Sequence, residues 1–403
     1  MRGKFFLPLL AVGLAACAVV PMATLPPAPS PTQAFTSIPT TAPTLTATPR
    51  PTPIPPALPA MASPRLAHIE FQDEFQGWGI TVNDNGHIVR TVDGGQAWLD
   101  ATPADAGQIG FSTTLFVLDP DHVWVLMPGP DFYSASLYRT TDGGLTWASN
   151  PVPFGGADIQ FLDPSIGRAL ADRGAGAGSN AVGLYQTSDG GVNWTSVFHN
   201  DPTEPGASDS LPLSGIKNGM KFQSADTGWV SGSVPVPGNI YLYTTHNGGG
   251  GWVQTSLPLP AGYENAMTMA HPPLFFGPDG LFPLTLYLPD STGLLFYASQ
   301  DGGGNWSAEG RTPVASGRYS FADASHGWVW DGAGPISMTS DGGRAWENIS
   351  PSLSLSGVLN QIQFVLAGSN GYTGWALTGL DESNHSQLFK TTDNGTTWMP
   401  LIP

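Results

Sequence analysis

The sequence has very little cysteine: among its 403 residues there is a single one, Cys17. No disulfide can therefore form within the chain, and the fold must be stabilised by packing and hydrogen bonds. Glycine (51) and proline (39) are instead abundant, which is typical of many short strands and tight turns rather than long helices.

Charge is also scarce, and basic charge is the scarcest: 11% of residues are charged and the formal net charge is −17. Residues 1–65 contain no Asp or Glu, so the remainder carries ten bases against 31 acids. A surface that acidic repels phosphate backbones, and no basic stripe interrupts it. We therefore expect no nucleic-acid partner.

The N-terminus has the layout of a targeting signal. Arg2 and Lys4 precede an apolar run that is too short to span a bilayer comfortably. The run includes Leu14-Ala15-Ala16-Cys17, which resembles the lipobox of bacterial lipoproteins. The resemblance implies cleavage after residue 16, lipidation of Cys17, and a membrane-anchored protein at the cell surface or in the periplasm. The alternative is an ordinary signal peptide with an incidental cysteine.

The next segment has the composition of a tether. Residues 18–65 include fourteen prolines and nine threonines. Such a stretch cannot bury a core and favours extended, disordered chain. The sequence thus predicts a signal peptide at 1–16, a lipidated cysteine and linker at 17–65, and one folded domain at 66–403.

Within the folded domain an eight-residue box, [Thr/Ser]-x-[Asp/Asn]-[Gly/Asn]-Gly-x-x-Trp, occurs seven times. Asp-Gly-Gly favours a hairpin turn, in which the carboxylate accepts turn N–H groups and the Ser or Thr hydroxyl adds a bond. We expect a structural role for these acidic or amide residues: Asp93, Asp142, Asp189, Asn247, Asp301, Asp341 and Asp393. We expect the same of the tryptophans that close the boxes: Trp98, Trp147, Trp194, Trp252, Trp306, Trp346 and Trp398.

A second motif, Phe-x-Asp-x-x-x-Gly-Trp, precedes the boxes. Its clearest copies start at Phe71, Phe222 and Phe321, and looser copies run from Phe116 to Trp124 and from Phe364 to Trp375. The third and fifth repeats read Gly167-Arg168 and Gly280-Leu281 at its end. One such unit suits one four-stranded antiparallel blade. The sequence predicts an all-β, seven-bladed β-propeller with both kinds of turn on one face and the variable loops on the other. The last blade is expected to meet the first by side-chain packing, without an exchanged strand.

The boxes resemble Asp-box (BNR) repeats, and the paired motifs look most like the photosystem II stability/assembly factor family. The resemblance covers residues 66–403 and implies a propeller with a binding or assembly role. That family uses an arginine patch to hold its client. Here seven arginines are scattered through an acidic domain, which departs from that pattern and argues against a role in photosystem assembly.

The residues favour a non-catalytic binding or scaffold module for an envelope protein or glycan, acting as a monomer. Twelve of thirteen tryptophans belong to the two motifs, which leaves little for a sugar platform. Possible ligand-face residues are Phe132, Tyr133, Arg168 and Arg173, although packed loops and solvated arginines explain them too.

No catalytic residue, cofactor or metal ligand is predicted. The eight histidines lack ligand spacing, and Asp73, Asp163 and Asp323 recur at equivalent places, as turn residues would. The alternative function is a secreted glycoside hydrolase, sialidase-like or endoglucanase-like, that uses two central carboxylates.

Overall fold

The computed structural model describes residues 57–131, 133–311, 313–332, 334–349, 359–368, 371–382 and 385–402. They belong to one compact unit, residues 55–403. All regular structure in this described part is β-strand, which confirms the predicted all-β class. Within it, no helix is long and apolar enough to cross a bilayer.

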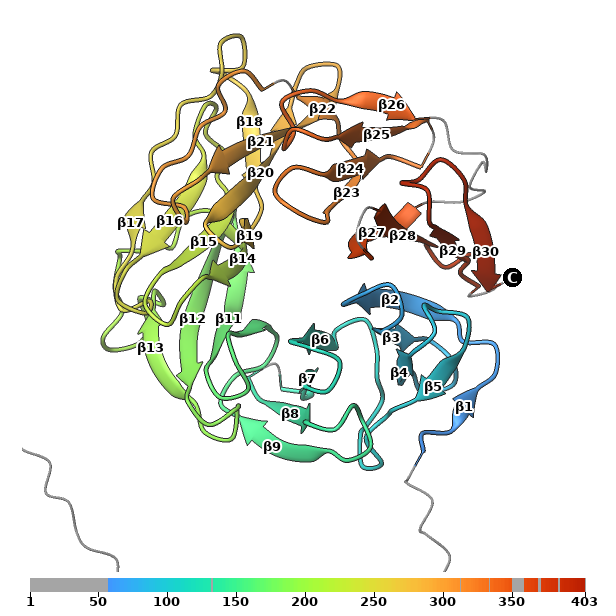
Figure 1. Ribbon diagram of the computed structural model, residues 1–403. Coiled ribbons are helices and arrows are strands. Elements are labelled where there is room, and N and C mark those ends of the chain that lie inside the picture. Colours follow the sequence, from blue (N-terminus) through green and yellow to red (C-terminus); the bar gives the residue numbers. More distant parts are fainter. Residues whose placement is uncertain are drawn as a thin grey trace, which may run out of the picture. The chain divides into compact units, whose positions relative to one another are not determined.

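The strands form antiparallel arrays that follow one another in chain order around a ring (Figure 1). The first array contains β1 (Ala60–Met61), β2 (Leu66–Phe71), β3 (Gly77–Thr81), β4 (His87–Thr91) and β5 (Trp98–Asp100). The second contains β6 (Thr114–Val117), β7 (Val123–Pro128), β8 (Ala135–Thr140) and β9 (Ala148–Val152). The third contains β10 (Ala157–Phe161), β11 (Gly167–Gly176), β12 (Ser179–Thr187) and β13 (Thr195–His199).

The fourth and fifth arrays share one nine-stranded sheet. The fourth contains β14 (Ile216–Phe222), β15 (Gly228–Ser233), β16 (Tyr241–Thr245) and β17 (Val253–Gln254). The fifth contains β18 (Met267–Ala270), β19 (Leu274–Phe276), β20 (Asp279–Tyr287), β21 (Thr292–Ser299) and β22 (Val314–Ala315). A single pairing of Ser233 with Met269 joins the two.

Two four-stranded arrays complete the chain. The sixth contains β23 (Arg318–Phe321), β24 (Gly327–Trp330), β25 (Ile336–Thr339) and β26 (Glu347–Ile349), and the seventh contains β27 (Leu359–Ala367), β28 (Gly371–Thr378), β29 (Leu388–Thr391) and β30 (Met399–Ile402). The described strands thus form six sheets, and seven blades result only if the shared sheet is divided at its one bridging pair. The number of blades stays an interpretation that matches the seven boxes.

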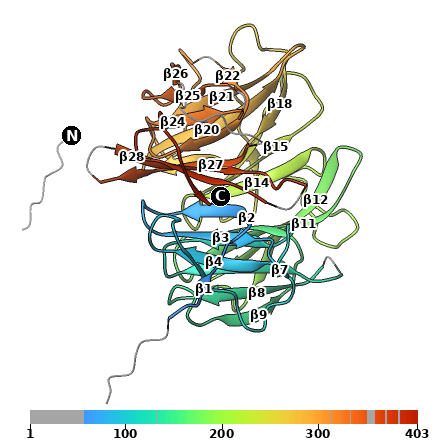
Figure 2. The same cartoon turned by 90° about the vertical axis from the view of Figure 1, so that its right-hand side faces the viewer.

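The seventh array lies beside the first, as Figures 1 and 2 both show. Two glutamine side chains of β27 bond the backbone of β2. Gln361 accepts from the Ile69 N–H (3.1 Å) and donates to the Ile69 carbonyl, and Gln363 bonds both backbone groups of Phe71 at 2.8 Å. Side chains, without an exchanged strand, therefore join the last array to the first.

The folded unit begins earlier than the sequence predicts. The linker was expected to extend to residue 65, yet β1 pairs with β5 at Ala60–Leu99 and Met61–Trp98. Leu58 and Met61 pack against two core clusters, so this part of the linker has apolar residues to bury. The predicted signal peptide, Cys17 and the rest of the predicted linker up to residue 56 lie outside the described residues.

Candidate functional site

The seven boxes share one hydrogen-bonded turn. In each, the Ser or Thr hydroxyl donates to the Asp or Asn side-chain oxygen over 2.8–2.9 Å. The same oxygen accepts the N–H of the residue before the tryptophan. Gly94 has φ 75°, and Asn394, which replaces this glycine in the seventh box, has φ 62°. Every box Asp or Asn therefore has the local bonds expected of a turn residue.

The turns between first and second strands lie on the same face as the boxes. The first glycine of a box donates to that turn of its own array, as Gly94 does to Phe75 and Gly342 to Ser325. Asp73, Asp163 and Asp323 each accept two backbone N–H groups within these turns. Their expected turn role is confirmed. We call this side the turn face, and the opposite side the loop face.

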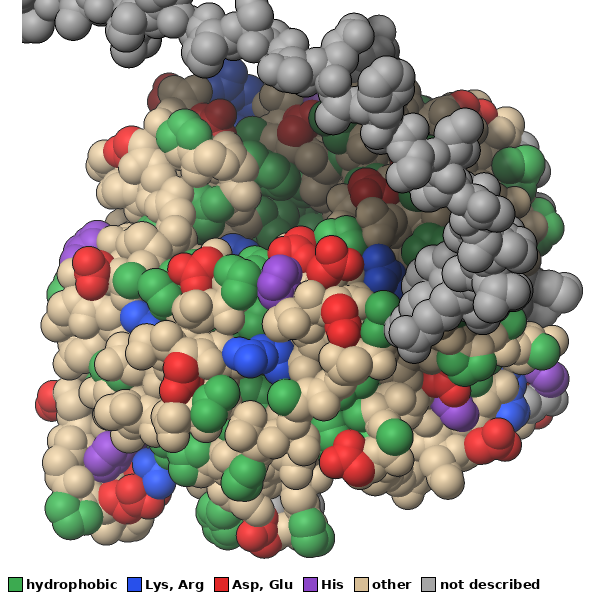
Figure 3. Space-filling model, turned by 60° about the horizontal axis from the view of Figure 1, so that its bottom comes forward, with side chains coloured by type: hydrophobic (Ala, Val, Ile, Leu, Met, Phe, Trp, Pro, Cys, Tyr) green, Lys and Arg blue, Asp and Glu red, His purple; other side chains and the backbone are tan. Residues whose placement is uncertain are grey.

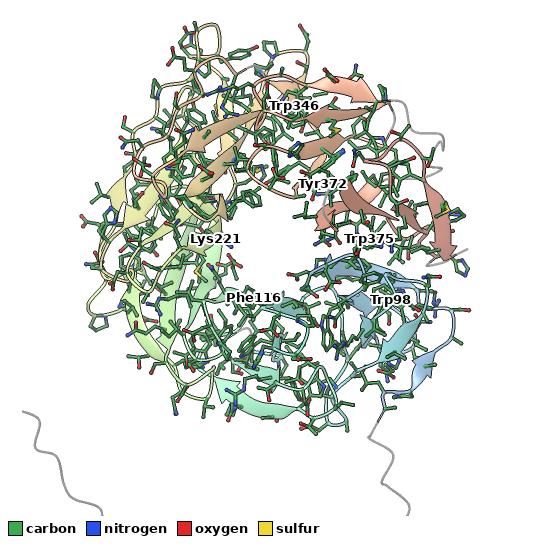
Figure 4. All side chains as sticks on the ribbon, viewed as in Figure 1. Trp98, Phe116, Lys221, Trp346, Tyr372 and Trp375 are labelled. Atoms are coloured by element: carbon green, nitrogen blue, oxygen red, sulfur yellow. The ribbon has the colours of Figure 1, made fainter. Side chains whose placement is uncertain are left out.

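The second motif joins neighbouring arrays. Trp375 of the seventh array stacks on Phe71 of the first with ring centroids 3.7 Å apart, and its indole N–H donates to the Gly94 carbonyl over 3.0 Å. Trp124 and Trp328 make the corresponding stacks and bonds to the third and seventh arrays. Figure 4 shows Trp375 close to the first array. The aromatic residues of this motif therefore hold the ring together.

Arg168 takes the place of the motif tryptophan in the third array. It is 4% exposed, lies over the Phe222 ring at 5.2 Å, and donates to the Ala225 carbonyl over 2.6 Å. Its guanidinium thus replaces the stacking and the bond of an indole. The expectation that Arg168 captures a ligand is therefore corrected, because the residue is buried between arrays.

The other ligand-face candidates are dispersed. Arg173 forms an ion pair with Glu204 at 2.6 Å, and Tyr133 is 75% exposed in the loop between β7 and β8. Phe132 lies outside the described residues. The structure does not bring Tyr133 and Arg173 into one of the cavities described below.

The loop face contains a cavity of about 830 Å³, which we call the main cavity. Hydrogen-bonding side chains line it: His271, Thr285, Tyr287, Thr292, Ser316, Arg318, Tyr319, Asp331, Asn360 and Gln361. Several are fixed by neighbours: His271 bonds Thr285 over 2.9 Å, and the Tyr319 ring packs edge-on against His271 and Phe296. Arg318, the first residue of β23, is exposed and lines this cavity. Asp331 is the one carboxylate among the described lining residues.

A second cavity of about 370 Å³, the side cavity, adjoins the main one, because Asn360 lines both. His68, Ile80 and Phe111 are among its other residues. A third cavity of the loop face, of about 460 Å³, lies by Asp158 and Lys217, and a separate cavity of about 780 Å³ on the turn face is lined by box and turn residues such as Asp279, Asp301 and Asp341. Figure 3 shows a hollow in the middle of the ring with acidic side chains around it.

The residue before the motif phenylalanine, at the inner edge of the ring, differs between the arrays. In the third and seventh arrays a glutamine precedes the motif phenylalanine and bonds the backbone of the next array, as Gln160 does with Phe222. The first and fourth arrays have Glu70 and Lys221 in this position. Figure 4 shows Lys221 at the inner edge. Two charged residues thus occupy a position at which two other arrays have a structural glutamine.

These groups affect one another's ionisation. Burial raises the pKa of Glu70 to about 8, and the Lys221 ammonium opposes that shift. Asp158 is exposed as a whole residue, but desolvation of its carboxyl group raises its pKa to about 6. The hydrogen bond from the Met220 N–H and the Lys221 ammonium oppose that shift. Burial lowers the pKa of Lys221. Within the described residues, no group of three His, Cys, Asp or Glu side chains could hold a metal ion.

Sequence reasoning missed Glu70, Asp158, Lys221 and the cavity residues. Comparing the residue before each motif phenylalanine would have revealed Glu70 and Lys221 as the two charged residues at this position. Phe111 lies in the connection between β5 and β6, where the repeat offers no comparison, and Asn360 is the second residue of β27 and belongs to neither sequence motif.

No protein-family model matches the chain, and no curated protein matches it. Among solved structures, the Niastella koreensis GH74 enzyme is 15% identical over 85% of this chain and 54% of its own, with a TM-score of 0.55. An ancestral GH74 enzyme is 13% identical over 87% of this chain and 47% of its own, with a TM-score of 0.51. The chain folds as a β-propeller. It spans about half the length of these two enzymes, and identities this low establish the fold alone.

A third similar structure is YCF48 bound to D1 peptide. It is 18% identical to this propeller over 79% of this chain and 94% of its own, with a TM-score of 0.49.

Proposed function

We propose that the protein is a non-catalytic binding or scaffold module of the cell envelope. A lipid on Cys17 anchors it, and the monomeric propeller binds an envelope protein or glycan at its loop face. The lipobox-like segment and the acidic composition support an extracytoplasmic location without nucleic-acid partners.

The main cavity is the observation that carries the binding role. It has the size of a small-molecule or oligomer subsite, and its described lining offers many hydrogen-bonding groups. Hydrolysis of a glycoside needs two carboxylates on either side of the bond. Asp331 is the one carboxylate in the described lining, and it accepts the Gly334 N–H over 3.1 Å. The cavity is therefore better suited to holding a ligand than to cleaving it.

The test is binding of the purified protein to envelope glycans and fractionated envelope proteins. We expect saturable binding that Arg318→Ala weakens without changing the melting temperature, because Arg318 is exposed. Binding that is unchanged in Arg318→Ala, or no binding to any fraction, would contradict the proposal.

A glycoside hydrolase remains a second candidate because Glu70 and Asp158 have raised pKa values, as an acid catalyst requires. The folds of the GH74 enzymes support its consideration. Turnover of sialosides, xyloglucan or other β-glucans that disappears in both Glu70→Gln and Asp158→Asn would favour it over the binding module.

A further inference from the structure

The main and side cavities lie next to each other on the loop face, and we call the two together the groove. They meet at Asn360, which lines both, and their volumes are about 830 Å³ and 370 Å³. The Asn360 amide donates to the Ala67 carbonyl over 2.9 Å, so this side chain is fixed where the cavities meet. A ligand that reaches from one cavity into the other must therefore pass Asn360.

An exposed aromatic ring borders the side cavity. Phe111 is 86% exposed, although it is apolar throughout. It lies in a closed turn in which the Thr113 N–H donates to the Gly110 carbonyl over 3.0 Å and the Gly110 N–H donates to the Thr113 hydroxyl over 3.1 Å. The turn presents Phe111 to solvent, so a ring face is available at little conformational cost.

A second exposed ring borders the main cavity. Tyr287, at the end of β20, is 46% exposed, and its hydroxyl lies 3.8 Å from the Met269 sulfur. Tyr287 lines the main cavity but not the side cavity, whereas Phe111 lines only the side cavity. The two rings therefore belong to different parts of the groove, and Asn360 lies where these parts meet.

The groove between the rings is polar but nearly uncharged. Burial lowers the pKa values of His68 and His271, so both rings are neutral at physiological pH. Arg318 and Asp331 are the charged residues of the described lining, and their charges offset. Hydroxyl groups supply much of the remaining polarity, from Thr113, Thr114, Thr285, Thr292 and Ser316.

We propose that this groove binds a neutral, linear oligosaccharide, with sugar rings stacked on Phe111 and Tyr287 and sugar hydroxyls bonded to Asn360 and the hydroxyls between them. Sugars combine apolar ring faces with many hydroxyls, which suits exposed aromatic rings beside amides and hydroxyls. The proposal rests on the proposed binding function and specifies its ligand.

The charges favour this ligand over an acidic polymer. The residues from 66 onward carry ten bases against 31 acids, which repels polyanions, and Arg318 is the one arginine in the described lining of the groove. A basic polymer would need more than the single Asp331 to bind it. A neutral chain is not repelled by the acidic protein and needs no charged partner in the groove.

The experiment measures binding of neutral β-glucan, β-mannan and β-xylan oligosaccharides, from disaccharides upward, by isothermal titration calorimetry on the full chain. We expect affinity to rise with chain length until both rings are occupied. Phe111→Ala and Tyr287→Ala should each weaken binding of the longest chains about tenfold. Tyr133→Ala is the matched control, because Tyr133 is also an exposed aromatic residue on this face, at 75%, but lines neither cavity.

Three results would overturn the proposal: no saturable binding in any series, affinity independent of length, or a loss in Tyr133→Ala equal to that in Phe111→Ala. The proposed function fails separately. If the oligosaccharides do not bind but an envelope protein binds and Arg318→Ala weakens it, the binding module stands and the oligosaccharide groove does not.

Discussion

The two faces of the propeller lie at opposite ends of the same strands and differ in how regular their connections are. On the turn face each array repeats the same bonds, and basic side chains donate to backbone carbonyls of the next array, as Arg90 does to Gly143 and Lys390 to Glu74. On the loop face the connections differ from array to array, and cavities lie between them. Residues that recur thus stabilise the ring, and residues that do not recur form the candidate site.

Ionisation shows the same contrast. Hydrogen bonds from the backbone and side chain of Asn193 lower the pKa of Asp189 to about 2 on the turn face. At the inner edge, burial raises the pKa of Glu70 to about 8. The charged form of a carboxylate therefore stabilises the turns, whereas at the inner edge the charged form of Glu70 destabilises the folded protein.

The largest loss of stability is expected from Trp375→Ala. Trp375 is fully buried, stacks on Phe71 and bonds the Gly94 carbonyl where the ring closes. Removing it should destabilise the protein by about 3–5 kcal/mol in chemical unfolding. Trp375→Phe keeps a ring for stacking and should lose less. Equal losses in both variants would mean that stacking contributes little.

Lys217 is an exception on the loop face, because it is buried at 8% exposure and fixes a long connection. Its ammonium lies 2.6–3.3 Å from five carbonyl oxygens, those of Asn180, Pro212, Leu213, Ser214 and Gly215. Lys217→Met should cost about 2–4 kcal/mol, since the oxygens lose their donor. Lys221→Met is the matched control. A melting temperature lowered equally by both would contradict this role.

Loss of a box carboxylate should reduce stability less than Trp375→Ala or Lys217→Met. Asp341 accepts the Thr339 hydroxyl and the N–H groups of Arg344 and Ala345. Asp341→Ala should cost about 1–3 kcal/mol and leave ligand binding by the folded protein intact. Asp341→Asn should cost less, because the fourth box has Asn247 here with equivalent bonds. A stable Asp341→Ala protein that no longer binds would indicate a ligand role instead.

The sequence predicted the turn face well because its bonds are local. A Thr two residues before an Asp, followed by a residue able to adopt positive φ, determines the turn without reference to the rest of the fold. The direction of motif stacking was not foreseen, since Trp375 and Phe71 are far apart in the chain. Arg168 was misjudged for the same reason: only the neighbouring array reveals that it substitutes for an indole.

The loop face could not be predicted because its groups come from different arrays. Asn360, Arg318 and Phe111 converge only once the ring has closed, and no spacing rule connects them. The start of the fold was misplaced since β1 is short and lies in a proline-rich stretch.

Glu70→Gln should change the pH dependence of stability. The raised pKa of Glu70 means that its contribution is fully present below about pH 4.5 and is lost as the pH rises through about 8. Glutamine resembles the protonated acid, so the variant should be more stable than the wild type at about pH 9 by about 1–2 kcal/mol and similar to it at about pH 4.5. Thermal unfolding across this range measures the difference, and parallel curves for the two proteins would refute it.

The smallest effect is expected at Arg173. This residue lies on the loop face but outside the groove, so its substitution tests whether the ligand binds in the groove or elsewhere on that face. Its ion pair with Glu204 is partly exposed, and such pairs contribute about 0–1 kcal/mol. Arg173→Ala and Glu204→Ala should therefore lower stability slightly, with a coupling energy that falls at high salt. Ligand binding should be unchanged, because neither residue lines the main or the side cavity. If Arg173→Ala instead abolished binding in a fully folded protein, the ligand would lie at the β11–β12 hairpin, and the cavities at Asn360 would not be the site.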